Sequence, residues 1–204
     1  MTAIDLKRRI GTVLAGLAAS ASLATSGCGT SAQALFYTLD STATPTGAAG
    51  ASYGVMVGPV TIPASVDRNQ FVVQVAPNRV EIDEFNRWAA PLAEGISRTV
   101  TSDLAVLLGT PDVAMAPFAN FDPAYRVTIN VQRFDSVQGQ SVLIDAVWAV
   151  NSTKSGTTRM GRTTARESVT DPSFDAIAAA HSRALAQVST DIAAAIRAAE
   201  SSTH

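Results

Sequence analysis

The sequence contains few of the residues that form disulfides, transition-metal sites or nucleic-acid-binding surfaces. Its 204 residues include one cysteine and two histidines. One thiol cannot close an intrachain disulfide, and two histidines make no convincing transition-metal site without acidic partners. Fifteen lysines and arginines stand against 17 aspartates and glutamates. This balance argues against nucleic-acid binding, which needs a basic face, and against electrostatic attraction to anionic lipid.

Long apolar runs are also missing from the sequence. Residues 10–24 are largely apolar, but Gly, Ser and Thr interrupt them. The run is shorter than the roughly 20 residues that a membrane-spanning helix needs. No later segment is long and apolar enough to span a bilayer. The sequence therefore predicts a body that reaches a membrane by some means other than a spanning helix.

The single cysteine ends a pattern typical of secretion. A basic cluster at residues 7–9 precedes the apolar run, and small residues then lead to Cys28. This order is typical of a bacterial signal whose cleavage leaves cysteine as the first residue. It predicts a signal peptide over residues 1–27 and a diacylglycerol and an N-acyl chain on Cys28. The alternative is an ordinary signal peptide with a chance cysteine near its cut site, and Thr25 stands where lipoprotein signals usually carry leucine.

The rest of the chain reads as one domain on a short tether. We predict a lipidated tether over residues 28–34, a single domain over residues 35–200 and a disordered tail over residues 201–204. No non-covalent cofactor is predicted. Small residues and prolines between positions 41 and 52 predict a mobile loop. Alternating and helical apolar patterns predict seven strands (35–39, 53–62, 69–76, 79–82, 125–134, 141–151 and 157–169) and two helices (86–108 and 174–199).

The order of these elements predicts the fold class. Strands, a helix, more strands and a second helix follow one another, and tight turns join consecutive strands. This favours an α+β fold: a single two-layer domain with an antiparallel sheet and two long helices on one face. The first helix would bury a stripe that begins at Trp88, with Pro91 tolerated near its first turn. The second would be capped by Asp171 or Ser173 and would carry His181 on its apolar stripe.

Motifs that carry catalysis are not found. The sequence has no H-E-x-x-H, no G-x-x-x-x-G-K and no G-x-S-x-G. His181 could be a general base, but a packing histidine is the favoured interpretation because no partner is evident. The acidic cluster of Glu81, Asp83 and Glu84 precedes the predicted helix, where the helix dipole favours acids. The chain is therefore predicted not to be an enzyme and to hold no metal.

One unusual stretch combines rigid prolines with a charged pair. Pro59 and Pro63 flank an apolar segment, and Asp67, Arg68 and Gln70 follow. Its companion is the Arg-Trp-Ala-Ala-Pro-Leu sequence at positions 87–92. The simpler interpretation is that Pro59, Pro63 and Pro91 fix the chain path and Trp88 fills the core. The sharper one is that Asp67, Arg68 and Gln70 present an edge that binds a partner.

These segments together resemble a known family. Cys28-Gly29, the Phe-Tyr-Thr-Leu-Asp sequence at 36–40, the Gly-Pro-Val-Thr-Ile-Pro sequence at 58–63 with Asp67, Arg68 and Gln70, and the 87–92 segment occur in order. In combination they resemble the ABC-type transport auxiliary lipoproteins, the PqiC/YmbA-like family. The resemblance spans essentially the whole chain after Cys28. It adds to the residue-based interpretation of a tethered α+β domain.

The resemblance implies a non-catalytic subunit of an envelope lipid-transport system. Such systems pair an inner-membrane ABC or polytopic component with a periplasmic MCE-domain protein that forms a tunnel, and the lipoprotein would dock the tunnel end. Gly29 after the lipidated cysteine implies an outer-membrane anchor facing the periplasm. Asp67, Arg68 and Gln70 would then contribute to docking on the MCE-domain protein or to assembly of a homo-oligomer.

Three other functions stay open at this point. One is a periplasmic adaptor lipoprotein for cell-wall synthesis or outer-membrane assembly, which would share the tethered α+β body. The second is a carrier that itself encloses lipid. The third is an enzyme that uses His181.

Overall fold

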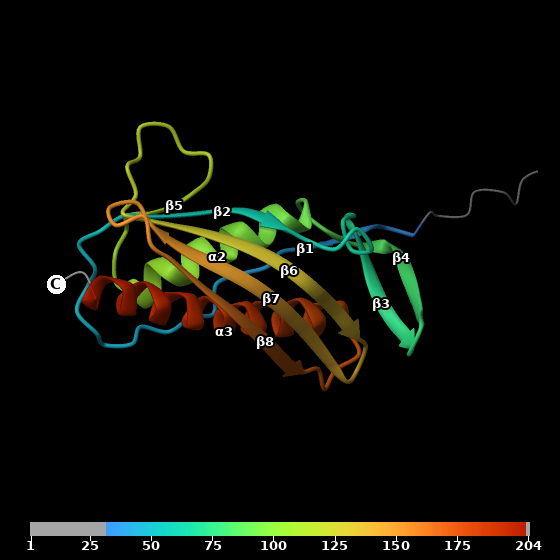
Figure 1. Ribbon diagram of the computed structural model, residues 1–204. Helices are drawn as coiled ribbons and strands as arrows, with labels where there is room; N and C mark the ends of the chain where they lie inside the picture. Colours follow the sequence, from blue (N-terminus) through green and yellow to red (C-terminus); the bar gives the residue numbers. More distant parts are fainter. Residues whose placement is uncertain (1–31, 203–204) are drawn as a thin grey trace, which may run out of the picture. The chain divides into compact units, whose positions relative to one another are not determined.

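The computed structural model describes residues 32–202 (Figure 1). The chain divides into two units between Gln33 and Ala34, and every described helix and strand lies in the second unit. Within the described residues, ten elements follow one another: β1 (Leu35–Tyr37), β2 (Val55–Thr61), β3 (Gln70–Ala76), β4 (Arg79–Trp88), α2 (Leu92–Leu108), β5 (Val113–Met115), β6 (Tyr125–Val137), β7 (Ser141–Ser152), β8 (Thr158–Ser168) and α3 (Phe174–Ser201).

The strands form two sheets. The larger has the order β5-β2-β6-β7-β8, and the smaller has the order β1-β4-β3. Strands β6, β7 and β8 form an antiparallel meander, and β3 and β4 form an antiparallel hairpin. The other pairs are parallel: β2 with β5 and β6, and β1 with β4. The prediction of one antiparallel sheet was therefore wrong in this respect, because distant segments of the chain supply the parallel pairs.

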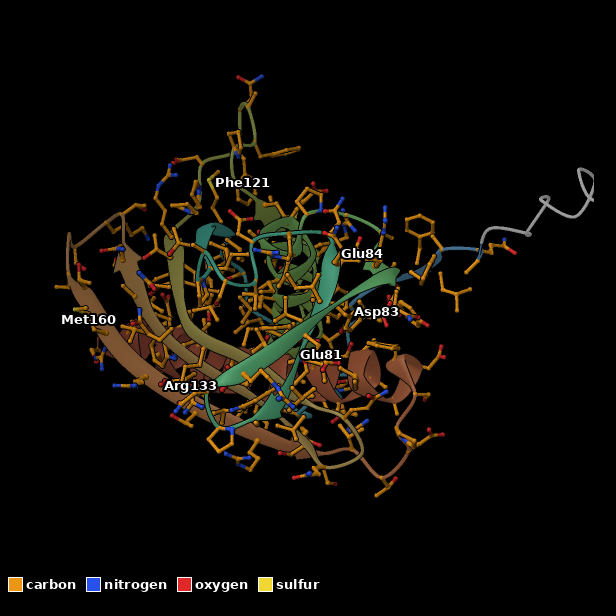
Figure 2. The ribbon with its side chains drawn as sticks, turned by 90° about the vertical axis from the view of Figure 1, so that its right-hand side faces the viewer. Glu81, Asp83, Glu84, Phe121, Arg133 and Met160 are labelled. Atoms are coloured by element: carbon orange, nitrogen blue, oxygen red, sulfur yellow. The ribbon has the colours of Figure 1, made fainter. Side chains whose placement is uncertain are left out.

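Both helices cover one face of the larger sheet (Figures 1 and 2). Helix α2 packs on β2 and β5, α3 packs on β7 and β8, and the helices also pack on each other. On β7 the predicted core face is buried: Val142, Ile144, Ala146, Trp148 and Val150 are each at most 8% exposed. The predicted α+β domain, with two helices on one face, is thus confirmed. Strand β8 lies at the edge of the sheet, as predicted.

Helix α2 begins six residues later than predicted. Trp88 does not start the helix but ends β4, where it pairs with Tyr37 of β1. Pro91 is the N-cap of α2, and the helix ends at Gly109, whose positive φ of 64° completes a left-handed cap. Strand β4 is correspondingly longer than the predicted return strand at 79–82, because pairing with β1 holds residues 86–88 extended.

Helix α3 matches its prediction closely. Ser173 is the N-cap, and its hydroxyl oxygen accepts a hydrogen bond from the Ala176 N–H at 3.2 Å. The predicted apolar stripe faces the core, with Ile177, Leu185 and Ile196 at most 1% exposed. The helix continues to Ser201, and Ser202 follows as its C-cap.

The segment between β1 and β2 has neither helix nor strand, but hydrogen bonds fix it to both helices. The Ser41 hydroxyl donates to Asp103 Oδ1 of α2 at 2.6 Å, and the Thr42 hydroxyl donates to the Ser182 carbonyl of α3 at 3.3 Å. Further along, the Ala51 N–H donates to the Leu108 carbonyl at 2.9 Å. The irregular segment predicted from composition is therefore tied to the helices near both of its ends.

Aromatic rings join the smaller sheet to the main core. Phe71 of β3 stacks on Trp88 with ring centroids 4.1 Å apart, and it meets Phe174 of α3 edge-to-face at 5.1 Å. Trp88 in turn lies 6.2 Å from Phe134 of β6. Such pairs stabilise beyond the area they bury. The cluster makes the base of the β3–β4 hairpin part of the domain, while its tip projects (Figure 1).

Candidate functional site

The residues singled out in the proline-rich stretch lie where the chain crosses between the two sheets. The Gly58–Pro59 peptide is cis and lies in β2, where the register with β6 shifts between Val57 and Val60. Two residues beyond β2, the Pro63 carbonyl accepts a hydrogen bond from the Val66 N–H at 3.1 Å. A path-fixing role for Pro59 and Pro63 stays a prediction.

Trp88 and Pro91 lie on the other side of this crossing. The Trp88 N–H donates to the Asn69 carbonyl at 2.6 Å, which ties the end of β4 to the residue just before β3. The Pro91 carbonyl accepts a hydrogen bond from the Gly95 N–H at 3.0 Å in the first turn of α2. The buried Trp88 indole and the first turn of α2 thus flank the segment that joins β2 to β3.

Asp67 and Arg68 are both exposed on a turn of this segment. Val66, which is 9% exposed, anchors the turn in the core, and the Arg68 N–H donates to its carbonyl at 2.8 Å. Neither charged side chain has a hydrogen-bond or ion-pair partner within residues 32–202. Gln70 is set apart on β3, half-buried and paired with Arg87. The turn thus presents two unpaired charges of opposite sign to solvent.

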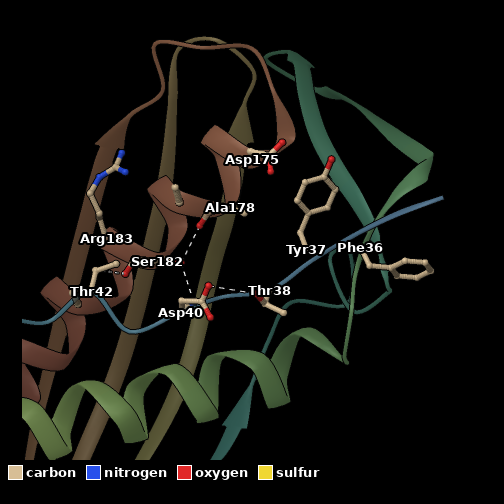
Figure 3. Close-up of a pocket in the computed structure, with 11 residues that line it drawn as sticks. Phe36, Tyr37, Thr38, Asp40, Thr42, Asp175, Ala178, Ser182 and Arg183 are labelled. Atoms are coloured by element: carbon tan, nitrogen blue, oxygen red, sulfur yellow. Dashed lines mark hydrogen bonds between the residues drawn. The ribbon is translucent and has the colours of Figure 1, made fainter. Parts of the chain in front are cut away.

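A surface groove of about 660 Å³ runs between the start of the domain and α3 (Figure 3). Ala178, Ala179 and Ala186 supply its apolar lining from the helix, and Asp40 and Asp175 supply acidic groups. Sequence reasoning missed this groove. The alanine-rich side of α3 was the signal available, because small side chains leave room that larger ones would fill.

Hydrogen bonds hold the groove in a fixed form. The Asp40 N–H donates to the Ser182 hydroxyl at 3.1 Å, and that hydroxyl donates to the Ala178 carbonyl at 3.0 Å. The one arginine of the lining, Arg183, donates from Nε to Glu167 at 2.9 Å. Burial, followed by the charges of Asp175 and Asp83, raises the pKa of Tyr37. These groups suit binding of a ligand or a chain segment, and none is arranged as a nucleophile with a base.

A second groove, of about 700 Å³, lies beside β5 at the edge of the larger sheet. Its lining includes Phe118 and Phe121, whose rings meet edge-to-face at 5.9 Å on a projecting loop (Figure 2). This loop was not recognised in the sequence as a surface feature. Both grooves are open to solvent, whereas the voids next to Trp88 measure only about 20 and 10 Å³. These two voids are far smaller than the roughly 300–1,000 Å³ of ordinary ligand pockets.

His181 lies fully buried in the core, as the packing interpretation predicts. Its ring stacks on Phe134 with centroids 3.8 Å apart, and Nε2 lies 2.8 Å from the Ser136 hydroxyl. Burial lowers its pKa to about 3. Nδ1 is buried without a hydrogen-bond partner. In this structure His181 is therefore a residue of the core.

The acidic cluster lies in a different place from the one predicted. Glu81, Asp83 and Glu84 belong to β4 rather than to the start of a helix, so the helix dipole does not act on them (Figure 2). Asp83 instead accepts hydrogen bonds from the backbone N–H groups of Phe85 and Asn86 at 2.9 and 2.7 Å. Burial acts to raise its pKa, but the donors of Asn86 and Phe85 outweigh burial and hold the pKa below its usual range.

The described residues hold no cluster of three or more histidine, cysteine or acidic side chains placed to bind a metal. No helix between residues 32 and 202 is long and apolar enough to cross a membrane. Cys28, the predicted lipidation site, lies outside the described residues.

Comparison with known families identifies the family of this chain. Residues 37–193 match the model of the family described as ABC-type transport auxiliary lipoprotein component. The chain belongs to this family. The resemblance found in the sequence is thereby confirmed, and the auxiliary-lipoprotein family matches the described domain over β2 to most of α3. No curated protein matches the sequence.

Solved structures share the fold of this auxiliary lipoprotein. The crystal structure of protein XCC0632 from Xanthomonas campestris superposes with a TM-score of 0.68 at 20% identity, covering 83% of this chain and all of that one (100%). Another crystal structure, of an uncharacterized protein, superposes with a TM-score of 0.66 at 20% identity, covering 81% of this chain and 99% of that one. At this identity the likeness establishes the fold alone.

Proposed function

We propose that this chain is a non-catalytic lipoprotein subunit of an envelope lipid-transport system, which docks a tunnel-forming, periplasmic MCE-domain protein at the outer membrane. The observation that carries the proposal is the family match, because the family is an auxiliary component of ABC-type transport. The inner-membrane partner would be the ABC or polytopic component of the same system. Cys28, carrying a diacylglycerol and an N-acyl chain, would anchor the domain at the periplasmic face.

The geometry of the domain supports a docking role. Asp67 and Arg68 stand unpaired on a turn that Val66 and Pro63 hold in place. Rigid presentation limits the conformational entropy lost on binding, and unpaired charges can meet complementary charges on a partner. Gln70, on the adjacent strand, would lie beside that contact. The same edge could alternatively join copies of this chain into a homo-oligomer.

The rigid turn provides a direct test of docking. Reversing both charges, Asp67→Arg with Arg68→Glu, is expected to lower co-purification of the MCE-domain protein roughly tenfold or more, because like charges then face each other across the contact. The matched control is Asp122→Lys with Lys154→Asp. Both control residues are also exposed, and they lie next to the start of β6 and the end of β7. Because β2 runs parallel to β6, Asp67, which follows the end of β2, lies toward the opposite end of the larger sheet.

The two variants separate docking from folding. The control is expected to co-purify the partner at the wild-type level, and both variants should melt as the wild type does because all four positions are exposed. A folded Asp67/Arg68 variant that retains the partner and its oligomeric size in full would exclude this edge from both docking and self-association.

A further inference from the structure

Three large apolar side chains are exposed at the end of the smaller sheet where the domain begins. Leu35, Phe36 and Phe85 are 53%, 64% and 49% exposed. Leu35 pairs with Asn86 and Phe36 pairs with Arg87 in the parallel β1–β4 ladder, and Phe85 immediately precedes the paired residues of β4. As consecutive strand residues, Leu35 and Phe36 lie on opposite faces of this end of the sheet. Phe36 also lies at the rim of the groove that Tyr37 lines, and Figure 3 shows its ring turned away from the Tyr37 ring. We call these three residues the apolar end of the smaller sheet. Grouped exposed apolar residues of this kind mark interaction sites.

The backbone around Phe85 is built to hold this arrangement. Strand β4 pairs Arg87 with Gln70 and then Ile82 with Val72, so residues 83–86 form an irregularity in the ladder. Asp83 holds this irregularity by accepting hydrogen bonds from the backbone N–H groups of Phe85 and Asn86, and from Asn86 Nδ2 at 3.0 Å. Asn86 Oδ1 in turn accepts a hydrogen bond from the Tyr37 hydroxyl at 2.7 Å. Such bulges re-aim a side chain, and here Phe85 is turned out beside β1.

The length of chain before β1 indicates what covers the apolar end. Six residues separate Cys28 from Leu35, so the two Cα atoms are at most about 25 Å apart when the chain is fully extended. If Cys28 is acylated, β1 therefore starts close to the lipid head groups. A partner protein could reach many surfaces of the domain, whereas the tether brings this end, and few others, to the bilayer.

We propose that Leu35, Phe36 and Phe85 insert into the interfacial layer of the membrane that carries the lipid anchor, and so orient the domain on it. This inference rests on the proposed anchoring at Cys28. Insertion would be driven by burial of apolar surface and not by charge. Glu81, Asp83 and Glu84 outnumber Arg79 and Arg87 on β4, so anionic lipid gives no electrostatic gain. Vesicles of zwitterionic lipid are therefore the expected target, with little dependence on salt.

The test uses the full lipoprotein in phosphatidylethanolamine–phosphatidylcholine vesicles, with an environment-sensitive dye on one introduced thiol. Glu84→Cys places the dye next to Phe85 without changing the apolar end, since the Glu84 side chain is 65% exposed. Met160→Cys is the control, because Met160 is 73% exposed on β8 of the larger sheet. Quenching by nitroxide lipid is expected to be at least about twofold stronger at position 84 than at position 160.

A companion variant separates insertion from mere nearness to the bilayer. Replacing all three apolar residues by serine should reduce quenching at position 84 to the level at position 160. If the triple variant fails to fold, Phe36→Ser alone should reduce it in the same direction. Equal quenching at both positions, or quenching at position 84 that survives the serine variant, overturns the proposal.

The mass of the purified protein distinguishes failure of this inference from failure of the anchor. An acylated Cys28 with no insertion refutes the inference and leaves the lipoprotein function standing. An unacylated Cys28 refutes both, because the chain before β1 would then have no attachment to the membrane. Protection of position 84 by the MCE-domain protein, in place of lipid, also overturns the proposal and makes the apolar end a protein contact.

Discussion

His181 links the core of the domain to its behaviour in acid. Burial lowers its pKa to about 3, far below the ordinary value of 6.5. The folded state therefore binds a proton more weakly than the unfolded state does. The stability that the neutral ring contributes is complete above pH 6.5 and is lost as the pH falls from 6.5 toward 3.

We expect acid to destabilise the wild type through this residue. At pH 5 the loss attributable to His181 is about 2 kcal/mol, at about 1.4 kcal/mol per pH unit. Denaturant unfolding at pH 7 and pH 5 measures this loss. Between the two pH values, the unfolding free energy of His181→Leu should fall by about 2 kcal/mol less than that of the wild type. Ser136→Ala, which removes the hydroxyl 2.8 Å from Nε2 but keeps the imidazole, should retain the wild-type slope. Parallel pH profiles for wild type and His181→Leu would contradict the assignment.

Asp103 has the opposite pH dependence. Burial raises its pKa, against the opposing effect of hydrogen bonds from Ser41, Ser189 and the N–H groups of residues 42 and 43. A raised pKa means that the folded state holds the proton more tightly, so this contribution is present at low pH and is lost as the pH rises through the folded-state pKa. The wild type should therefore lose stability as the pH rises from 4 to 7, whereas Asp103→Asn should not lose this contribution. The difference in unfolding free energy should shift in favour of Asp103→Asn over this range. Melting curves at the two pH values check the sign, and a gain in the reverse direction would contradict it.

At the scale of elements, the packing of β7 against β8 depends on one position without a side chain. Trp148 lies over Gly161, and a Cβ there would lie 2.2 Å from the indole ring. The indole cannot move easily, because Nε1 donates to the Thr163 hydroxyl at 3.0 Å, which donates to Asp191 of α3 at 2.6 Å. The sheet and the helix thus share this contact.

Two glycine substitutions should therefore have opposite effects. Gly161→Ala is expected to cost about 1–3 kcal/mol of unfolding free energy, because the methyl overlaps the indole. Gly95→Ala, at the end of the first turn of α2, should add about 0.5 kcal/mol, since its Cβ would meet Leu39 at an ordinary 3.6 Å. Denaturant unfolding measures both changes. A neutral Gly161→Ala would show that the indole has room to shift.

Local patterns in the sequence predicted the elements whose partners are near in the chain. The β6–β7–β8 meander and α3 follow from alternation, tight turns and a Ser cap. Trp88 misled the prediction of α2, because its spacing to Leu92 suits a helix while its actual partner is Tyr37, about fifty residues earlier. The strands that became β1 and β2 were predicted, but their parallel pairing was not, since it depends on distant segments of the chain. The short strand β5 was not predicted.

The candidate site was predicted only in part. Asp67 and Arg68 were identified as an unusual charged pair, and the structure places both on one exposed turn. The groove along α3 and the exposure of Phe36 and Phe85 were not identified, because apolar residues in a strand ordinarily face a core. Only the three-dimensional register shows that these side chains are left uncovered.

At the scale of the whole molecule, we propose that acyl chains on Cys28 hold the domain at a membrane. Cys28→Ala is expected to move the protein from the membrane fraction to the soluble fraction, because the acyl chains supply the attachment. Thr25→Leu, which restores the usual signal residue, should leave it on the membrane. Fractionation of cells that express each variant checks this, and membrane retention of Cys28→Ala would contradict anchoring by that thiol.

The fold by itself does not establish what is transported, because one fold serves many functions. The proposed function depends above all on the partner, and a cross-linking pull-down from native membranes tests it, with the full lipoprotein tagged at its C-terminus. We expect recovery of an MCE-domain protein together with an inner-membrane ABC or polytopic component. Recovery of cell-wall synthases or outer-membrane assembly proteins alone would contradict it and would favour an adaptor built on the same tethered domain.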